Sequence, residues 1–147
     1  MNVTSRMSAS LDDTVDGVVD NIKHQLEGRA YKAANELRNA SQLVLRGSRS
    51  GRVYTVPGTK RKYTASGPGE PPANRTGTFR MSWQASSHVV YGSYISRIES
   101  NVRTDNGRYN LGSVLEEGTS RMAPRPYVDQ ILERAEPEIV KIYAEDY

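Results

Sequence analysis

The feature of the sequence that most constrains the fold is a run of apolar side chains that recur at every third or fourth position over residues 11–46. Leu11, Val15, Val18 and Ile22 begin the run, and alanines and leucines continue it. This spacing places the apolar side chains on one face of a single α-helix. At 1.5 Å per residue the helix would be about 54 Å long, which is more than one small sheet can cover. We therefore expect part of its apolar face to pack against another subunit.

Composition narrows the remaining possibilities. The 147 residues include 36% hydrophobic and 25% charged side chains and fit one domain that spans 1–147. The chain has no cysteine, which excludes disulfide scaffolds, thiolate metal sites and cysteine nucleophiles. No stretch approaches the ~20 apolar residues that cross a bilayer, and we expect the chain in the cytoplasm of the cell that makes it.

Charge is distributed unevenly along the chain. Residues 46–80 carry eight basic side chains and one acid, a local charge of +7, so the rest of the chain sums to −4. A basic segment of this kind suits contact with nucleic-acid phosphates. It equally suits a self-assembling subunit, in which it would dock on acids of a neighbour such as Glu133, Glu136 and Glu138. A solvated loop is the third interpretation, and charge alone does not separate the three.

The centre of the chain predicts β-structure. Val53–Val56 and Arg61–Thr64 flank a Pro-Gly turn, which predicts a protruding hairpin with basic residues near its tip. Proline and glycine then fill the rest of the segment 47–77 and predict a loop. Alternating residues over 78–115 predict an antiparallel sheet whose three strands are Thr78–Val90, Tyr94–Arg103 and Tyr109–Leu115. Tyr91-Gly92-Ser93 and Asp105-Asn106-Gly107 are the expected turns between them, and the Asn-Gly pair is a strong hairpin signal.

The end of the chain predicts a loop over 116–126 and a helix over 127–145, which contains Pro137. The expected fold class is α+β, with the long N-terminal helix and the shorter C-terminal helix packed on one face of an antiparallel sheet of three to four strands.

Catalytic motifs are missing from the sequence. His24 and His88 lie in different predicted elements, without carboxylates at the spacing of metal ligands. Glu116 and Glu117 are adjacent on the sequence, and on a strand their carboxyl groups would point to opposite faces. We therefore expect no enzyme activity, no metal and no cofactor.

Two segments resemble a known family. Residues 66–82 read SGPGEPPANRTGTFRMS and residues 115–127 read LEEGTSRMAPRPY. They resemble the "APGEPPA…TG.L..S" and "(L/V)E(F)GT…(M)…(R)PF" signatures of the neck, or tail-completion, proteins of tailed bacteriophages, also described as minor tail components. The order of motifs and helices agrees over nearly the whole chain, although Glu117 and Tyr127 replace residues more usual in that family. The motif positions that set turns are Pro68, Gly69, Pro71, Pro72, Thr76, Gly77, Glu116, Gly118, Thr119, Pro124 and Pro126.

The resemblance implies a structural virion protein that forms a homo-oligomeric ring around the DNA channel at the head–tail junction. Its implied neighbours are other neck proteins, the head-closure and tail-terminator components, and it would occupy the host cytoplasm during assembly. Contact with packaged double-stranded DNA is an open possibility. The candidates to line the DNA channel, or alternatively a subunit interface, are Arg49, Arg52, Lys60, Arg61 and Lys62. The alternative is a small non-specific nucleic-acid-binding protein. The motifs are also compatible with turns that simply close the fold.

Overall fold

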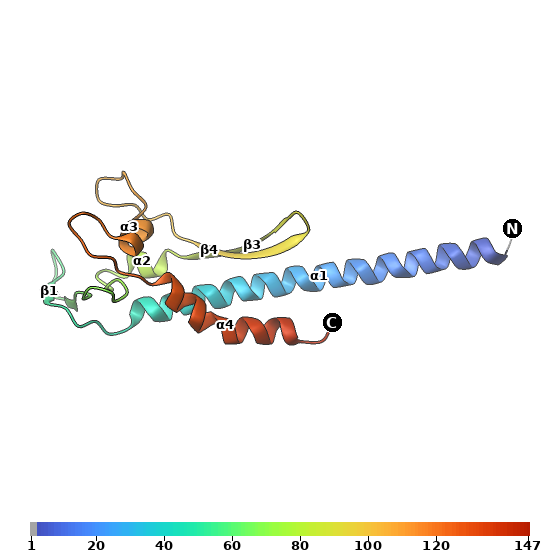
Figure 1. Ribbon diagram of the computed structural model, residues 1–147, viewed down its shortest axis with the longest axis horizontal. Helices are drawn as coiled ribbons and strands as arrows, with labels where there is room; N and C mark the ends of the chain where they lie inside the picture. Colours follow the sequence, from blue (N-terminus) through green and yellow to red (C-terminus); the bar gives the residue numbers. More distant parts are fainter. Residues whose placement is uncertain (1–2) are drawn as a thin grey trace.

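A long helix, α1 (Val3–Arg46), is the axis of the molecule in the computed structural model, which describes the backbone of residues 3–147 and the side chains from residue 11 onward. Figure 1 shows it running without a break from the N-terminal end of the molecule to the part of the fold that contains α2 and α3. The helix begins at Val3, earlier than the expected start at Leu11, and neither Gly17 nor Gly28 interrupts it. The α+β class and the two expected helices are confirmed.

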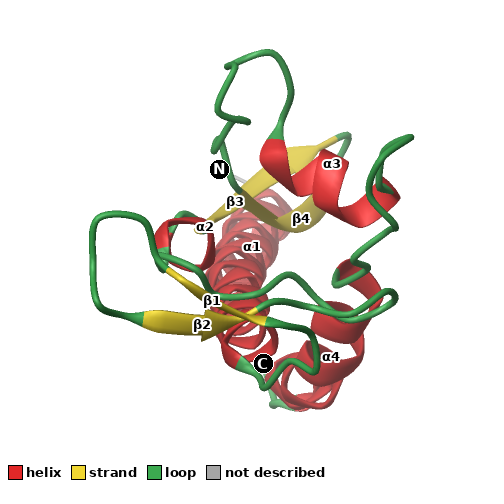
Figure 2. Cartoon of the chain, turned by 90° about the vertical axis from the view of Figure 1, so that its left-hand side faces the viewer, coloured by secondary structure: helices red, strands yellow, loops and turns green. Residues whose placement is uncertain are grey.

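Two elements pack on opposite sides of α1. One is the hairpin of β3 (Gln84–Val90) and β4 (Ser93–Glu99), and the other is α4 (Val128–Ala144). Figure 2 looks along α1 and shows the hairpin on one side of it and α4 on the other. The expectation that both helices cover one face of a sheet is therefore wrong, since α1 separates α4 from the hairpin.

Small side chains let these elements approach α1 closely. Ala30, Ala33 and Ala34 are buried, and the hydroxyl of Ser96 in β4 donates a hydrogen bond of 2.7 Å to the carbonyl of Ala30. The alanine-rich part of the apolar run is thus the part that the rest of the chain covers.

The expected sheet of three to four strands is also wrong. The described residues form two separate two-stranded sheets, β3 with β4, and β1 (Val53–Thr55) with β2 (Lys62–Thr64). The strand expected from Thr78 begins only at Gln84, and the six residues before it begin with a single helical turn, α2 (Thr78–Met81). The turn between β3 and β4 is confirmed, with Tyr91 and Gly92 at φ 48° and 77°, as a two-residue hairpin turn of type I′ requires.

The third expected strand, Tyr109–Leu115, is mostly helical. It contributes to α3 (Leu111–Glu117), which also occupies the first residues of the expected loop 116–126. Asn110 decides the outcome, because its side chain accepts a hydrogen bond of 3.2 Å from the backbone N–H of Ser113 and so caps the helix. The Asn-Gly turn before it does form, with Gly107 at φ 69°, but it leads into a helix.

The core lies at the C-terminal half of α1. Leu37, Ala40 and Leu45 pack there with Tyr127 and Ile131, and the partly buried Phe79, Trp83, Ile98 and Leu115 surround them. The core is small and lies at one end of α1, so most of the N-terminal half of α1 has no part in it.

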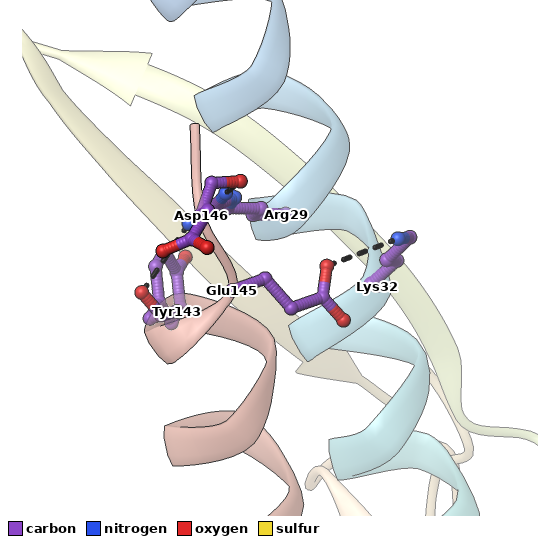
Figure 3. Close-up of polar contacts among 5 residues, drawn as sticks. All are labelled: Arg29, Lys32, Tyr143, Glu145 and Asp146. Carbon is purple, nitrogen blue, oxygen red and sulfur yellow. Dashed lines mark hydrogen bonds and ion pairs between the residues drawn. The ribbon is translucent and has the colours of Figure 1, made fainter.

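The C-terminus is held on the middle of α1 by Arg29, as Figure 3 shows. Its buried guanidinium donates hydrogen bonds to the carbonyls of Tyr143 (3.2 Å) and Asp146 (2.8 Å) and stacks 3.9 Å from the ring centroid of Tyr147. A nearby ion pair joins Lys32 to Glu145 at 3.9 Å. The cation thus meets the negative end of α4's dipole, a favourable placement.

Beyond this point the described side chains of α1 are uncovered. All side chains of residues 11–24, which we call the arm, are exposed, and Figure 1 shows this part of α1 projecting past the C-terminus. The expectation that one subunit cannot cover the whole apolar face of the helix is confirmed.

Candidate functional site

The two motif segments, far apart in the sequence, lie together at the end of the molecule opposite the arm. The backbone N–H of Gly69 in the first donates a hydrogen bond of 3.3 Å to the carbonyl of Pro124 in the second. Pro71 and Pro72 are buried, whereas Pro68 is exposed. The N–H of Arg125 also bonds to the carbonyl of Leu115 at 2.7 Å, which closes the second motif on itself.

Glu116 joins the second motif to α4. One oxygen of its carboxylate accepts hydrogen bonds from the backbone N–H groups of Tyr127 (2.8 Å) and Val128 (3.3 Å). The first residues of a helix have no intrahelical partners for these groups, and a carboxylate there is stabilised by the helix dipole. Burial, together with the charge of Glu116, raises the pKa of Tyr127 to about 12. Glu116 is thus a helix cap supplied from another helix, and Glu117 beside it is exposed.

Gly118 permits the turn that follows. It ends α3 at φ 76°. A Cβ there would lie 2.7 Å from the carbonyl oxygen of Met122 and 2.8 Å from the nitrogen of Pro124, so only glycine fits. The hydroxyl of Thr119 accepts hydrogen bonds from the N–H groups of Arg121 and Met122 and holds the turn.

The first motif ends on an aromatic cluster. Gly77, at φ 85°, starts α2, and the hydroxyl of Thr76 hydrogen-bonds to that of Thr78 at 3.1 Å. In consequence Phe79 lies edge-on to Tyr127, with ring centroids 5.8 Å apart. Trp83 contacts both rings, at 5.5 Å and 5.9 Å. The motif turns therefore carry the residues that close the core.

Four of the five candidate basic residues are exposed, and the fifth is not. Arg52, Lys60, Arg61 and Lys62 lie on or beside the β1–β2 hairpin and are exposed. The guanidinium of Arg49 instead donates hydrogen bonds to the carbonyls of Val44, Ser48 and Pro72, and burial lowers its pKa. Its contacts make Arg49 a structural residue that ties the end of α1 to the first motif.

The base of the hairpin is held by Glu70. Its carboxylate accepts hydrogen bonds from the hydroxyl (2.5 Å) and N–H (3.1 Å) of Ser50 and from the N–H of Gly67 (2.7 Å). These bonds lower the pKa of Glu70 to about 2, and the bond from the Ser50 hydroxyl contributes most. At the tip, Gly58 has φ 76° and the N–H of Thr59 bonds to the carbonyl of Val56, which confirms the Pro-Gly turn. Tyr54 and Tyr63 stack across the strands, with ring centroids 5.9 Å apart.

A cavity of about 760 Å³ lies between the first motif, α2, α3 and the loop before α3. Phe79, Val102, Leu111, Leu115 and Met122 contribute apolar side chains to its lining. The lining also includes four arginines and one acid, namely Arg75, Arg80, Arg103, Arg125 and Asp105. Sequence reasoning missed this arginine cavity, because the four arginines are spread over fifty positions and only folding brings them together.

The positive charges of the four cavity arginines are not balanced by acidic partners within the described residues. Within the described part of the chain none of the four forms an ion pair within 4.0 Å, and buried nitrogens of Arg80 and Arg125 have no hydrogen-bond partner. An unpaired buried donor is costly, so an acidic group brought to the cavity would stabilise it.

Other kinds of site are not found among the described residues. They contain no cluster of three or more His, Asp or Glu side chains that could hold a metal ion. None of the helices described is both long and apolar enough to span a membrane. Comparison of the chain with protein-family models, curated proteins and solved structures found no match.

Proposed function

We propose that this chain is a structural virion protein of a tailed bacteriophage. In this proposal it is a neck, or tail-completion, subunit that forms a ring around the DNA channel at the head–tail junction. It works by assembly and not by catalysis, and its neighbours are other neck components.

The observation that carries the proposal is the union of the two motif segments. The residues by which the sequence resembles the neck family are the ones that meet in space, through the Gly69 to Pro124 hydrogen bond and the cap that Glu116 places on α4. A chance resemblance in two loops would not require them to build one joint structure. The uncovered arm adds support, since exposed apolar side chains in a row are typical of assembly surfaces.

Electron microscopy of the purified protein and of particles tests the proposal directly. We expect closed rings from the protein at high concentration, and density for this chain at the vertex where the tail joins the head. A protein that stays monomeric at every concentration and is missing from virions would refute it.

A second function, non-specific binding of nucleic acid, is favoured by the exposed hairpin alone. Arg52, Lys60, Arg61 and Lys62 are exposed on or beside its two short strands, and such a row of basic side chains is suited to diffuse contact with phosphates. Within a ring the same side chains are the ones we assign to the DNA channel, because they are exposed. Arg61 donates one hydrogen bond of 3.3 Å to the carbonyl of Arg75, whereas Arg49 is held by several.

Replacement of Lys60, Arg61 and Lys62 by serine separates these roles. We expect rings to form normally, DNA retention or infectivity to fall, and the salt dependence of residual DNA binding to flatten by about one unit of slope per lost phosphate contact. Replacement of the exposed Arg38, Arg121 and Arg134 by serine removes the same charge elsewhere and is the matched control. Loss of rings in the hairpin variant alone would place these residues at a subunit interface and refute the channel assignment.

A further inference from the structure

The arm presents an apolar stripe that its own subunit leaves bare. Leu11, Val15, Val18, Val19 and Ile22 follow helical spacing and are between 38% and 63% exposed. Exposed valine and leucine side chains in an unbroken row cost solubility, and burial of each would contribute about 1.5–3 kcal/mol in a fully covered site. The stripe is therefore a surface that a partner can cover.

Charge specifies the kind of partner. The arm carries four acids and one basic residue, Lys23. Because successive helical residues turn by about 100°, Asp12 lies about 20° beyond the edge of the apolar stripe and Asp16 about 60° beyond it on the same side, while Asp13 and Asp20 lie on the opposite face. The partner surface must then be apolar with a basic border.

The arginine cavity of the same chain has these properties. Its apolar residues are flanked by four arginines against one acid, and the arginines have no carboxylate partners within the described residues. An amphipathic helix laid into an apolar groove is a common mode of recognition, with the apolar anchors giving affinity and the charged border giving register.

The arm cannot reach the cavity of its own subunit. Leu45 of α1 lines the cavity, and Leu11 lies 34 residues earlier on the same unbroken helix, about 50 Å away along its axis. Figure 1 shows the arm and the elements around the cavity, α2 and α3, at opposite ends of the molecule. Any contact between them joins two copies.

We propose that the arm of one subunit docks in the arginine cavity of the next. The inference deepens the proposed function and rests on it, since it names the contact by which a ring would form. The contact uses a different surface on each copy, and such head-to-tail contacts generate rings when the rotation closes. In this inference the acids that contact the basic surface of a neighbouring copy belong to the arm. They replace Glu133, Glu136 and Glu138 of α4, which the sequence offered as candidates.

Sedimentation velocity on charge-reversed variants tests the contact. The double variant D12K/D16K should be monomeric at concentrations where the wild type assembles. The control D13K/D20K makes the same change of charge on the far face of the arm and should assemble normally. The control E133K/E136K, on α4, should also assemble. Assembly of D12K/D16K, or loss of assembly in E133K/E136K alone, would overturn the inference.

The apolar stripe is tested without a change of charge. Valine and serine have similar helix propensity, and neither Val15 nor Val18 belongs to the core, so V15S/V18S should keep the fold and its thermal unfolding temperature. We expect the association constant to fall about tenfold or more, since the contact would no longer bury the two valine side chains. An unchanged association constant would contradict the inference.

Mixing two defective variants identifies the receptor site. R75D/R103D changes two exposed arginines of the cavity and should be monomeric, as D12K/D16K is. Together they keep one intact arm and one intact cavity, so a mixture should associate at concentrations where neither variant does so alone. A mixture that stays monomeric would refute the cavity as receptor.

These outcomes separate the inference from the proposed function. Rings that form in the wild type and persist in D12K/D16K would leave the neck function standing and refute the arm contact. A wild type that never assembles, while R75D/R103D alone loses DNA binding, would refute both and place nucleic acid in the cavity.

Discussion

Removal of the Glu116 carboxylate should destabilise the protein through α4. This side chain accepts two backbone N–H groups at the start of α4, at 2.8 Å and 3.3 Å, and Tyr127 at the helix start has no side-chain cap of its own. Loss of a helix cap costs about 0.5–2 kcal/mol, and loss of a charge at the dipole a further 0.3–1 kcal/mol. The contact is only partly buried, so we expect Glu116→Ala to lower the free energy of unfolding by about 2 kcal/mol. Glu116→Gln, which keeps an acceptor, should cost about 1 kcal/mol.

Calorimetry at a fixed protein concentration measures the effect. In a chain of this length 1 kcal/mol corresponds to about 2–4 °C, so Glu116→Ala should unfold about 4–8 °C below the wild type. The exposed neighbour supplies the control, and Glu117→Ala should stay within about 0.5 kcal/mol of the wild type. Equal unfolding temperatures for the two alanine variants would show that the cap contributes nothing and would refute the link between the second motif and α4.

Three further predictions concern the other contacts that hold the fold. Arg29→Met removes the two hydrogen bonds of a buried cation and should lower the free energy of unfolding by denaturant by about 1.5–3 kcal/mol. Lys32→Met, at an exposed ion pair, should lower it by under about 1 kcal/mol. Equal losses would contradict the role of Arg29 in holding the C-terminus on α1. The pKa of Glu70 should be measured near 2 by NMR, below its ordinary value of 4.5. The stabilisation of the hairpin base by Glu70 is therefore full above pH 4.5 and is lost as the pH falls through about 2. A titration near 4.5 would disprove the three hydrogen bonds. Gly118→Ala should destabilise by more than about 1 kcal/mol because φ is 76° and the Cβ has no room, while Gly17→Ala, where nothing lies within 4 Å, should be neutral or stabilising, and the reverse order would be evidence against this turn.

The long helix and the hairpin turns could be predicted because their signals are local. Apolar spacing over residues 11–46 and around Ile131 depends only on the period of a helix, and the turns at Pro57 and Gly92 depend on backbone preferences of single residues. These features hold whatever the rest of the chain does, and the structure contains them.

The third strand and the arginine cavity could not be predicted in the same way. Tyr109–Leu115 satisfies an alternating pattern and also places Leu111 and Leu115 four apart, so the cap on Asn110 decides between strand and helix. The cavity depends on contacts between four separate elements, which no spacing rule reaches. Nor does the sequence say which part of the apolar helix stays bare, since that depends on where Arg29 holds the C-terminus.

The rigidity of α1 matters for the proposed contact. Its C-terminal half packs between the β3–β4 hairpin and α4, and the arm precedes that half with no loop between the two. The direction in which the arm leaves one subunit is therefore set by the core of that subunit. A closed ring needs the same rotation at every interface, and an arm on a flexible linker would not supply it. Because one unbroken helix runs through both the core and the arm, the packing around Ala30, Ala33 and Ala34 would fix the angle between neighbouring subunits.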